Sequence, residues 1–470
     1  MSLFQAKKAP ALLDERMFSL KDMLKIAAPL IIQQILGVTA GAVDTMMVSY
    51  AGDAAVSGVS LVNSLDTFLI LFFNSLVTGG AVVISQTLGR KSYEEGREVS
   101  KQLLYIAPAM APVISLLSFA FRKPLLSMLF GSAEADVMYH AEWYFFIILF
   151  SFPFVAVEGS VIAIFRSAGN SVIGMLVTMI ANVLNVIGNA ILIIGLDMGA
   201  MGAAISTVGA RVFSGCVLLV LIHNKKHVIY LEKLLHYKPD FHIIRRILHI
   251  GVPSGIEGGM FHFGKLMTQS LISTMGTAVI AANAVALTVS QYQYITGTAY
   301  SNTSYTVVGQ CVGAGNKREA KRCARTLLFF NYLTIWVVIL ATVIFINPIL
   351  SLFNTSPESA EVARSLLLYH SICAALIWPL GFMLPAIFRA ASDVRFPLIT
   401  SLTSMWVFRV ALSYVLALDS ISVFGWFTLP GLGMGVMGVW VAMTVDWVCR
   451  STLYVIRFFS GRWMRKRSLQ

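Results

Sequence analysis

The sequence predicts an all-α integral membrane protein, with twelve transmembrane helices in two pseudo-symmetric six-helix lobes around a central cavity. Three observations support this fold class: an apolar composition, twelve hydrophobic spans and an internal duplication. Of the 470 residues, 57% are hydrophobic and only 12% are charged. Soluble domains carry about 25% charged residues. The composition therefore indicates a chain that resides in lipid.

Roughly 20 apolar residues cross a bilayer. On that length scale the chain contains twelve candidate spans, at 23–48, 55–88, 102–121, 141–165, 172–195, 200–222, 247–274, 277–311, 326–346, 363–387, 396–418 and 433–457. The second and eighth are too long for one perpendicular crossing, and we expect them to be tilted, bent or partly interfacial. Residues 1–22 carry acids and bases and run into a full-length span, so the first helix is expected to act as its own insertion signal.

The net charge of +12 is distributed according to topology. If the N-terminus is cytoplasmic, 28 of the 35 Lys and Arg residues fall in inner loops and tails and three in outer loops, with four inside spans. This split follows the positive-inside rule and predicts a multi-pass plasma-membrane protein with both termini in the cytoplasm. The basic charge is thereby attributed to topology and lipid headgroups, and we expect no nucleic-acid partner.

The chain repeats itself at a nearly constant offset. GDAAVSGVSL (52–61) matches GTAVIAANAV (276–285), and SQTLGRKSYEEG (85–96) matches GQCVGAGNKREA (309–320), both at an offset of 224. IFRSAG (164–169) matches IFRAAS (387–392) at 223. Because six is even, both copies enter the membrane from the same side, which is the parallel-repeat arrangement of two-lobed transporters.

These features divide the chain into five segments. We expect a cytoplasmic N-terminal segment at 1–22, an N-lobe at 23–222 and a linker on the inner leaflet at 223–246. The C-lobe follows at 247–457 and a basic cytoplasmic tail at 458–470. A monomer with a cleft between its lobes is the expected functional unit.

Polar side chains inside the first lobe form a candidate cation site. A charge at the bilayer centre costs roughly 2.5–3.5 kcal/mol even on the lenient insertion scale, so such residues usually serve a function. One face of the first span carries Asp44, the fifth span carries an asparagine stripe and the sixth carries a hydroxyl. The candidate ligands are Asp44, Asn185, Asn189 and Thr207. Their oxygens suit Na⁺ or a shared proton, although asparagines also serve as interhelical hydrogen-bond partners.

A second set of polar residues predicts a substrate cavity. In the N-lobe these residues lie on the first two spans, and in the C-lobe they lie on the seventh and eighth. The predicted cavity residues are Gln33, Asn63, Asp66, Glu257, Gln291, Gln293 and Asn302. Amide groups and neighbouring tyrosines suit flat organic molecules. Glu257 is equally open to a structural ion pair with Lys265 or a neighbouring span.

Several function classes lack their motifs. The five cysteines show no CxxC spacing, no GxxxxGK[ST] phosphate loop occurs and no HExxH zinc motif is present. We therefore expect no enzyme activity, no ATP site and no cofactor other than a coupling ion. The loop after the second span reads GRKSYEEGREVS and lacks the GxxxDRxGR pattern of major-facilitator symporters.

The motifs together resemble the multidrug and toxic compound extrusion (MATE) transporters, near the DNA-damage-inducible protein F branch. They include VDTMMVSYAG at the end of the first span, the paired Q-x2-G loops (Gln86–Gly89 and Gln310–Gly313), IFRSAGNS, and LNVIGNAILIIGLDMGAMGAAIST. The resemblance covers about residues 20–458. It implies alternating access of two lobes, with export of organic cations or amphipathic drugs against inward flow of Na⁺ or H⁺.

The resemblance also assigns roles to single residues. Asp44 matches the first-span acid that the family uses for cation coupling, while Asn185 and Thr207 match its fifth- and sixth-span polar residues. Asn189 departs from the aspartate of many relatives, which leaves the choice of ion open. The remaining alternative is a flippase for lipid-linked precursors; such proteins usually carry a strongly basic cavity, and the sequence shows few cations within spans.

Overall fold

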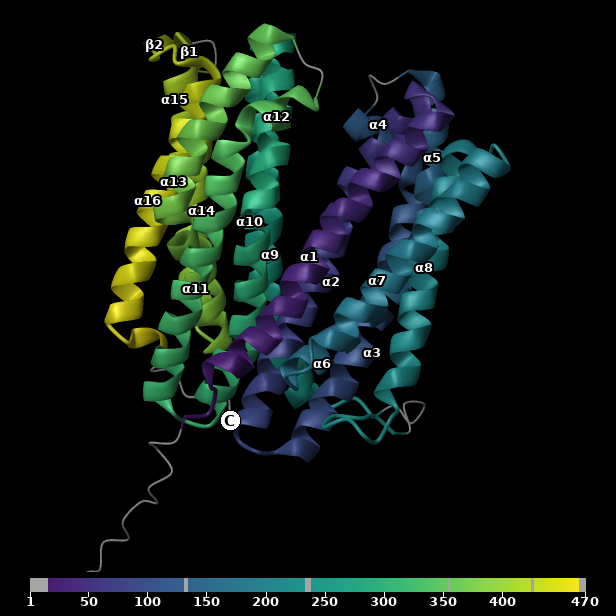
Figure 1. The fold of residues 1–470 in the computed structure, drawn as a ribbon, viewed down its shortest axis with the longest axis vertical. Coiled ribbons are helices and arrows are strands. Elements are labelled where there is room, and N and C mark those ends of the chain that lie inside the picture. The colour runs from purple at the N-terminus through teal and green to yellow at the C-terminus, as the bar shows by residue number, and fades with distance from the viewer. Residues whose placement is uncertain (1–15, 131–133, 233–237, 354–355, 424–426, 465–470) are drawn as a thin grey trace, which may run out of the picture.

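The computed structural model describes residues 16–130, 134–232, 238–353, 356–423 and 427–464. These residues form two helical bundles that meet at one end, the closed end, and diverge toward the other, the open end (Figure 1). The N-lobe consists of α1 (Leu20–Val48), η1 (Ser49–Ala51), α2 (Asp53–Gly89), α3 (Tyr93–Ala120), α4 (Arg122–Phe130), α5 (Ala135–Ile148), η2 (Leu149–Ser151), α6 (Phe152–Ser167), α7 (Val172–Asn189), the π-helix η3 (Ala190–Gly195) and α8 (Gly199–Ile222).

The C-lobe repeats this plan. It consists of α9 (Phe241–Ser273), α10 (Thr277–Gly313), α11 (Lys317–Ile344), α12 (Ile346–Ser351), α13 (Pro357–Ala390), α14 (Arg395–Ser404), the π-helix η4 (Met405–Ala411), α15 (Leu412–Ala417), β1 (Ser420–Val423), β2 (Phe427–Pro430), α16 (Gly435–Phe459) and η5 (Arg462–Met464). The two strands pair antiparallel, with Ser420 opposite Pro430.

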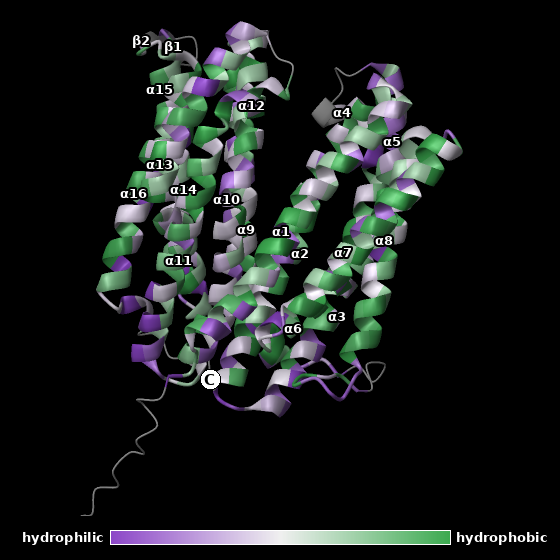
Figure 2. Cartoon of the chain, in the orientation of Figure 1, coloured by the Kyte–Doolittle hydropathy of each residue, from purple (hydrophilic) through white to green (hydrophobic). Residues whose placement is uncertain are grey.

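The twelve predicted spans coincide with helices or runs of consecutive helices, which confirms the all-α two-lobed layout. Within the described ranges, ten helices are long and apolar enough to cross a membrane on those criteria alone. The remaining two of the twelve spans are α9 and α10, which carry polar residues along their length; Figure 2 shows this for the middle of α10. The long second and eighth spans are continuous helices of 37 residues each, α2 and α10.

Some local features differ from the sequence prediction. The short helices α4 and α12 and the β1–β2 hairpin occupy outer loops for which no structure was predicted. α9 begins at Phe241, six residues before the predicted start of the C-lobe, because the Asp240 side chain accepts hydrogen bonds from the backbone N–H groups of His242 and Ile243. An N-cap of this kind fixes where a helix begins.

The duplication is visible in the backbone. α2 and α10 are each preceded by a glycine with positive φ, Gly52 at 94° and Gly276 at 97°. Only glycine adopts such angles readily. α1 and α9 each contain one proline, Pro29 and Pro253, at the same offset of 224. The two lobes therefore share turn geometry as well as sequence.

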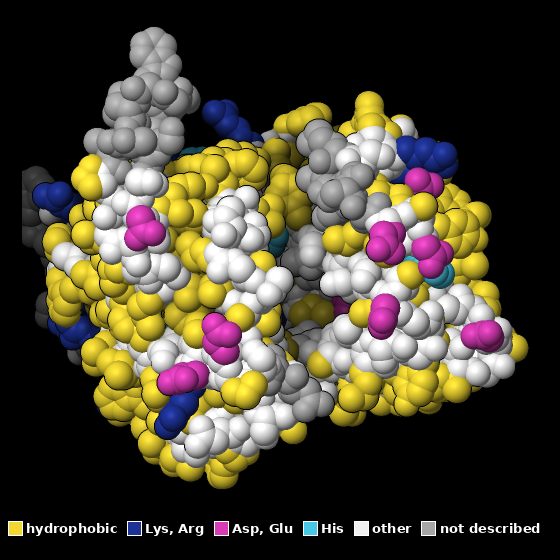
Figure 3. Space-filling view, turned by 90° about the horizontal axis from the view of Figure 1, so that it is seen from above, with side chains coloured by type: hydrophobic (Ala, Val, Ile, Leu, Met, Phe, Trp, Pro, Cys, Tyr) yellow, Lys and Arg dark blue, Asp and Glu magenta, His cyan; other side chains and the backbone are white. Residues whose placement is uncertain are grey.

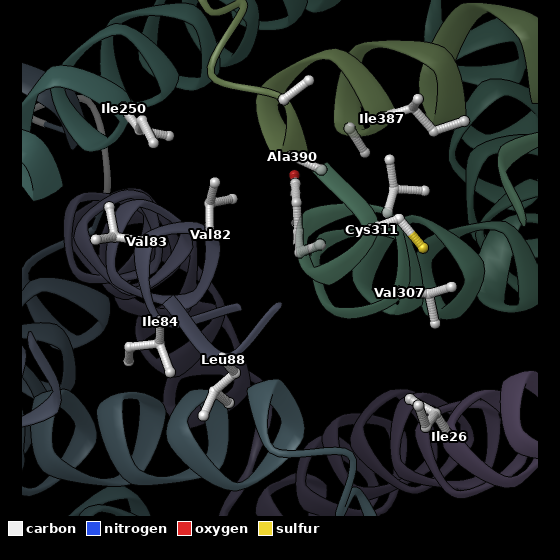
Figure 4. Close-up of a cluster of buried hydrophobic side chains, with 14 of the residues drawn as sticks. Ile26, Val82, Val83, Ile84, Leu88, Ile250, Val307, Cys311, Ile387 and Ala390 are labelled. Atoms are coloured by element: carbon white, nitrogen blue, oxygen red, sulfur yellow. The ribbon is translucent and has the colours of Figure 1, made fainter. Parts of the chain in front are cut away.

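The distribution of buried residues explains the V shape. The largest hydrophobic cluster lies at the closed end and combines residues from both lobes, as Figure 4 shows for α1, α2, α9, α10 and α13. A second cluster belongs to the N-lobe apart from the partly buried Leu248, and a third belongs to the C-lobe alone. Apolar burial thus joins the lobes at one end and leaves them separate at the other.

Close backbone approach at the closed end depends on the two Q-x2-G motifs, which form the last turns of α2 and α10 rather than loops. A Cβ on Gly89 would lie 2.0 Å from the carbonyl oxygen of Gln310, and a Cβ on Gly313 would lie 2.0 Å from that of Gln86. Real Cβ atoms do not approach this closely. Only glycine at these two positions lets α2 and α10 touch.

The glutamines of the two Q-x2-G motifs, Gln86 and Gln310, each donate a hydrogen bond to the opposite lobe. Gln86 Nε2 donates to the carbonyl oxygen of Ala390 over 2.8 Å, and Gln310 Nε2 donates to that of Ser167 over 2.7 Å. Ser167 and Ala390 are themselves equivalent at an offset of 223. The closed end therefore carries one interlobe contact made twice, once by each copy of the repeat.

We predict that Gly89→Ala opens the closed end. The added methyl group overlaps the Gln310 carbonyl and disfavours this conformation by about 1–3 kcal/mol, the usual cost of overpacking. Spin labels on cysteines replacing Tyr93 and Lys317, both exposed beside the contact, should report a larger share of long distances. Gly209→Ala is the control, since its Cβ would meet nothing within 4 Å. Identical distance distributions in both variants would refute the prediction.

Candidate functional site

The four predicted cation ligands lie together in the N-lobe. Asn189 Nδ2 donates to Asp44 Oδ1 over 2.6 Å and contacts Asn185 Oδ1 at 3.5 Å. Asn185 Nδ2 in turn reaches Thr207 Oγ1 at 3.3 Å. Asp44 comes from α1, the asparagines from α7 and Thr207 from α8. The group therefore lies where α1, α7 and α8 meet inside the N-lobe, and α1 runs along the side of this lobe that faces the C-lobe (Figure 1).

The hydrogen bonding of this group is incomplete. Asn189 is fully buried, and its Oδ1 has no hydrogen-bond partner among the described residues. A buried acceptor without a partner costs about 1–3 kcal/mol. A cation or a proton donor at this oxygen would remove that cost.

The chemistry of the donor set favours a monovalent cation or a proton. It offers one carboxylate with amide and hydroxyl oxygens, which are the ligands of hard cations. In the parts of the chain that the structure describes, no group of three or more His, Cys, Asp or Glu side chains lies close enough to hold a metal. The ligand set therefore lacks the nitrogen, sulfur or multiple carboxylate donors of transition-metal sites.

The backbone changes where the ligands end. α7 stops at Asn189 and continues as the π-helix η3. The equivalent span of the C-lobe also contains a π-helix, η4, which carries Arg409. π-turns within helices frequently occur at functional sites, because they rotate side chains relative to a regular helix.

Three predicted cavity residues of the N-lobe have partners within the lobe. None of them lines the cavity that lies between the lobes near Glu257. Asp66 forms a buried ion pair with Arg211 of α8, with an Oδ2–Nη2 distance of 2.7 Å. Gln33 Nε2 donates to Thr178 Oγ1 over 3.0 Å, and Asn63 Oδ1 accepts from the Tyr144 hydroxyl over 3.2 Å. Asp66 therefore does not line this cavity as predicted, because its carboxylate is held inside the N-lobe by the guanidinium of Arg211.

Glu257 borders that cavity, which has a volume of about 280 Å³. Its carboxylate pairs with Arg389 of α13 at 2.7 Å and accepts a hydrogen bond from Ser401 over 2.7 Å. The neighbouring-span alternative for Glu257 is therefore confirmed. The cavity extends to Asn74 of α2 in the N-lobe, so it lies between the lobes.

The eighth-span residues do not converge on this cavity. Gln293 is buried inside the C-lobe, where its Nε2 donates to Ser371 Oγ over 3.0 Å and its Oε1 lies 3.1 Å from His370 Nδ1. Its prediction as a cavity residue is wrong, because α13 covers that face of α10. Gln291 is exposed and Asn302 is half-buried, and neither lines the cavity.

Sequence reasoning missed several partners. It assigned no role to Arg211 or Arg389, which pair with Asp66 and Glu257. The duplication could have indicated which spans pair. Gln33 and Glu257 are equivalent at an offset of 224, and their hydrogen-bond partners Thr178 and Ser401 are equivalent at an offset of 223. The same pairing of spans is thus neutral in the N-lobe and charged in the C-lobe.

Two matched six-helix lobes, with a carboxylate embedded among the helices of the first, define a two-lobed secondary transporter. The MatE family model matches residues 29–191 and again residues 253–415, once in each lobe. The two matches are separated by the 224-residue offset of the repeat. The chain belongs to the MATE family, whose members are transporters rather than enzymes.

Curated relatives match most of the length of the chain. The uncharacterized transporter YisQ of Bacillus subtilis is 28% identical, with 98% of this chain and 97% of the relative covered. The probable multidrug resistance protein NorM of Thermotoga maritima is 24% identical, with 96% of this chain and 94% of the relative covered. The multidrug export protein MepA of Staphylococcus aureus is 21% identical over 80% and 82%.

Solved structures confirm the fold. A MOP superfamily transporter from Pyrococcus furiosus superposes with a TM-score of 0.84 at 18% identity, covering 94% of this chain and 95% of that one. A multidrug resistance MATE family transporter in an outward-facing conformation gives 0.81, again at 18% identity, over the same shares.

We predict that the Asp44 group binds an ion and that binding stabilises the fold. Exchanging choline for sodium, or lowering the pH, at constant ionic strength should raise the unfolding temperature of the purified protein. At 100 times the dissociation constant the stabilisation amounts to about 2.7 kcal/mol. Asp44→Asn should lose this response, whereas Asp53→Asn, which alters an exposed acid at the start of α2, should retain it. Equal responses in both variants would exclude Asp44 as a ligand.

We also predict that the Asp66–Arg211 pair is structural. Asp66→Asn leaves the buried guanidinium without its charge partner, and breaking a buried pair in this way costs about 3–5 kcal/mol. The unfolding temperature should fall markedly in this variant and recover in the double variant Asp66→Leu/Arg211→Met. A single variant as stable as the double would contradict the structural role.

Proposed function

We propose that the protein is a secondary active antiporter that exports organic cations or amphipathic organic molecules in exchange for Na⁺ or H⁺. The names of NorM and MepA relatives, which refer to multidrug resistance and multidrug export, support a substrate of this kind. The observation that carries the proposal is the polar group at Asp44, Asn185, Asn189 and Thr207. It combines an embedded carboxylate with a buried amide oxygen that has no hydrogen-bond partner among the described residues.

The mechanism follows from the two-lobed geometry. An ion that enters from the outside reaches Asp44 and changes the packing of α1 against α7 and α8. A change in this packing favours one orientation of the lobes only if the ion binds one state more tightly than the other. Substrate in the space between the lobes is then released to the outside, and the ion leaves on the inside after the lobes rock.

The space between the lobes opens at the end opposite to the described chain ends. Both described chain ends lie at the closed end, and the hollow between the lobes opens at the opposite end, as the view from above shows (Figure 3). The positive-inside rule places the chain ends in the cytoplasm. With that orientation in the plasma membrane, the conformation is outward-facing. We propose that a single copy of the chain suffices for transport, because both lobes lie in one chain.

A flippase for lipid-linked precursors is the second candidate. Two arginines that line the cavity, Arg389 and Arg450, favour it, as do Lys265 and Arg409 near Phe261, since a basic cavity suits lipid phosphates. Reconstituted transport of a lipid-linked substrate without drug efflux would select this candidate over the antiporter.

Proteoliposomes distinguish the coupling ions. Efflux of a fluorescent drug should be driven by an imposed sodium gradient or by an imposed proton gradient, and Asp44→Asn should reduce it at least about tenfold, equivalent to roughly 1.4 kcal/mol of coupling. Asp53→Asn should transport like wild type. Wild-type efflux by Asp44→Asn under both gradients would remove Asp44 from the mechanism and overturn the proposal.

A further inference from the structure

Three cations of the C-lobe converge on one aromatic ring. The centroid of Phe261 lies 5.2 Å from Lys265 Nζ, 5.4 Å from Arg409 Cζ and 5.3 Å from Arg450 Cζ. These side chains come from α9, η4 and α16. Cations on an aromatic face gain modest stabilisation from the ring, but three on one ring also repel one another.

Carboxylates balance only part of this charge. Asp446 pairs with Arg450 at 2.6 Å and lies 3.8 Å from Arg409, so one acid serves two guanidinium groups. Glu257 is already paired with Arg389. Lys265 forms no ion pair with any described residue. Four cations against two carboxylates leave an excess of two positive charges in this half of the cleft.

Two of the four cations, Arg389 and Arg450, border the cavity between the lobes. Arg450, Arg389 and Phe261 line that cavity together with Phe382 and Tyr305. Arg450 is 2% exposed and also lies over the ring of Phe382, at 5.3 Å. Lys265 follows Phe261 by one helical turn and is exposed, and its ammonium interacts electrostatically with Arg409 and Arg450. Lys265 is thus an exposed residue whose ammonium lies near the Phe261 ring and has no carboxylate partner among the described residues.

The N-lobe presents the opposite charge. The position equivalent to Lys265 is Gly41, and the position equivalent to Asp44 is Thr268. In the N-lobe, three carboxylates, of Asp44, Asp66 and Glu158, lie near the guanidinium of Arg211, and Asp66 pairs with it. The charges around the proposed ion site are therefore mainly acidic, whereas those around Phe261 in the C-lobe are mainly basic.

We propose that the C-lobe half of the cleft is a binding subsite for the acidic group of an amphipathic substrate. The acidic group is a carboxylate, sulfonate or phosphate. Lys265 and Arg450 contact this group, and Phe261 and Phe382 contact the apolar body of the substrate. Arg and Lys bind such groups through charge-assisted hydrogen bonds. The assignment rests on the proposed export function for its biological meaning and narrows the substrate class to anionic or zwitterionic amphiphiles. Binding at the subsite is measurable without transport.

A pair of dyes that differ only in one carboxylate tests the subsite. Rhodamine B carries a free carboxylate, and its ethyl ester does not. Fluorescence anisotropy with the full-length protein in phosphatidylcholine nanodiscs should show about three- to tenfold tighter binding of the acid. Lys265→Gln should abolish this preference, and Lys265→Arg should keep it. Lys123→Gln, which removes the same charge from an exposed site on α4, should behave as wild type.

The outcomes separate the subsite from the export function. Equal or tighter binding of the ester by wild type, or a preference unchanged in Lys265→Gln, would overturn the subsite. Displacement of the acid dye when phosphatidylglycerol is added to the nanodiscs would identify an anionic headgroup as a further occupant and support the assignment. A Lys265-dependent preference without ion-driven efflux of either dye in proteoliposomes would sustain the subsite while refuting the export function.

Discussion

The close approach of α2 and α10 at the closed end is the constraint on which the shape of the molecule depends. Gly89 and Gly313 remove the side chains that would separate the two helices, and Gln86 and Gln310 then reach carbonyl groups of the opposite lobe. These contacts allow one hydrophobic cluster to form across both lobes. Because the other two main clusters lie almost entirely within single lobes, the helices diverge and a cleft opens between them.

A duplicated scaffold with this contact still holds different chemistry in its two halves. The equivalent residues Gln33 and Glu257 bond to equivalent hydroxyl residues, Thr178 and Ser401, but only the second pair recruits an arginine. Asp44 has no acidic counterpart in the C-lobe, and Lys265 has no basic counterpart in the N-lobe. The repeat sets where side chains can face the cleft, and single substitutions set the charge that each half presents.

The fold was largely predictable because span length and repetition are properties of the sequence itself. The grouping of Asp44, Asn185, Asn189 and Thr207 was also predicted, since helical spacing places the asparagines on one face of α7. Asp66 and Gln293 were misassigned because periodicity identifies a polar face without identifying its partner. Arg211 and His370 lie 145 and 77 residues away from them, and only packing brings them together. The positive excess around Phe261 was missed for the same reason, as its cations come from three separate spans.

α1 provides the physical link between the ion site and the lobes. Just before its first turn, the backbone N–H of Met17 donates to Glu319 of α11 over 3.1 Å, and Arg322 of α11 donates to the Phe18 carbonyl oxygen, so this end is tied to the C-lobe. Near its other end, Asp44 is tied through Asn189 to α7 of the N-lobe. An ion that changes the second attachment therefore acts on a helix whose first attachment belongs to the opposite lobe. A ligand shifts a two-state equilibrium only if its affinities for the two states differ. Because α1 is attached to both lobes, a difference in ion affinity that depends on the position of α1 has the greatest effect on the orientation of the lobes.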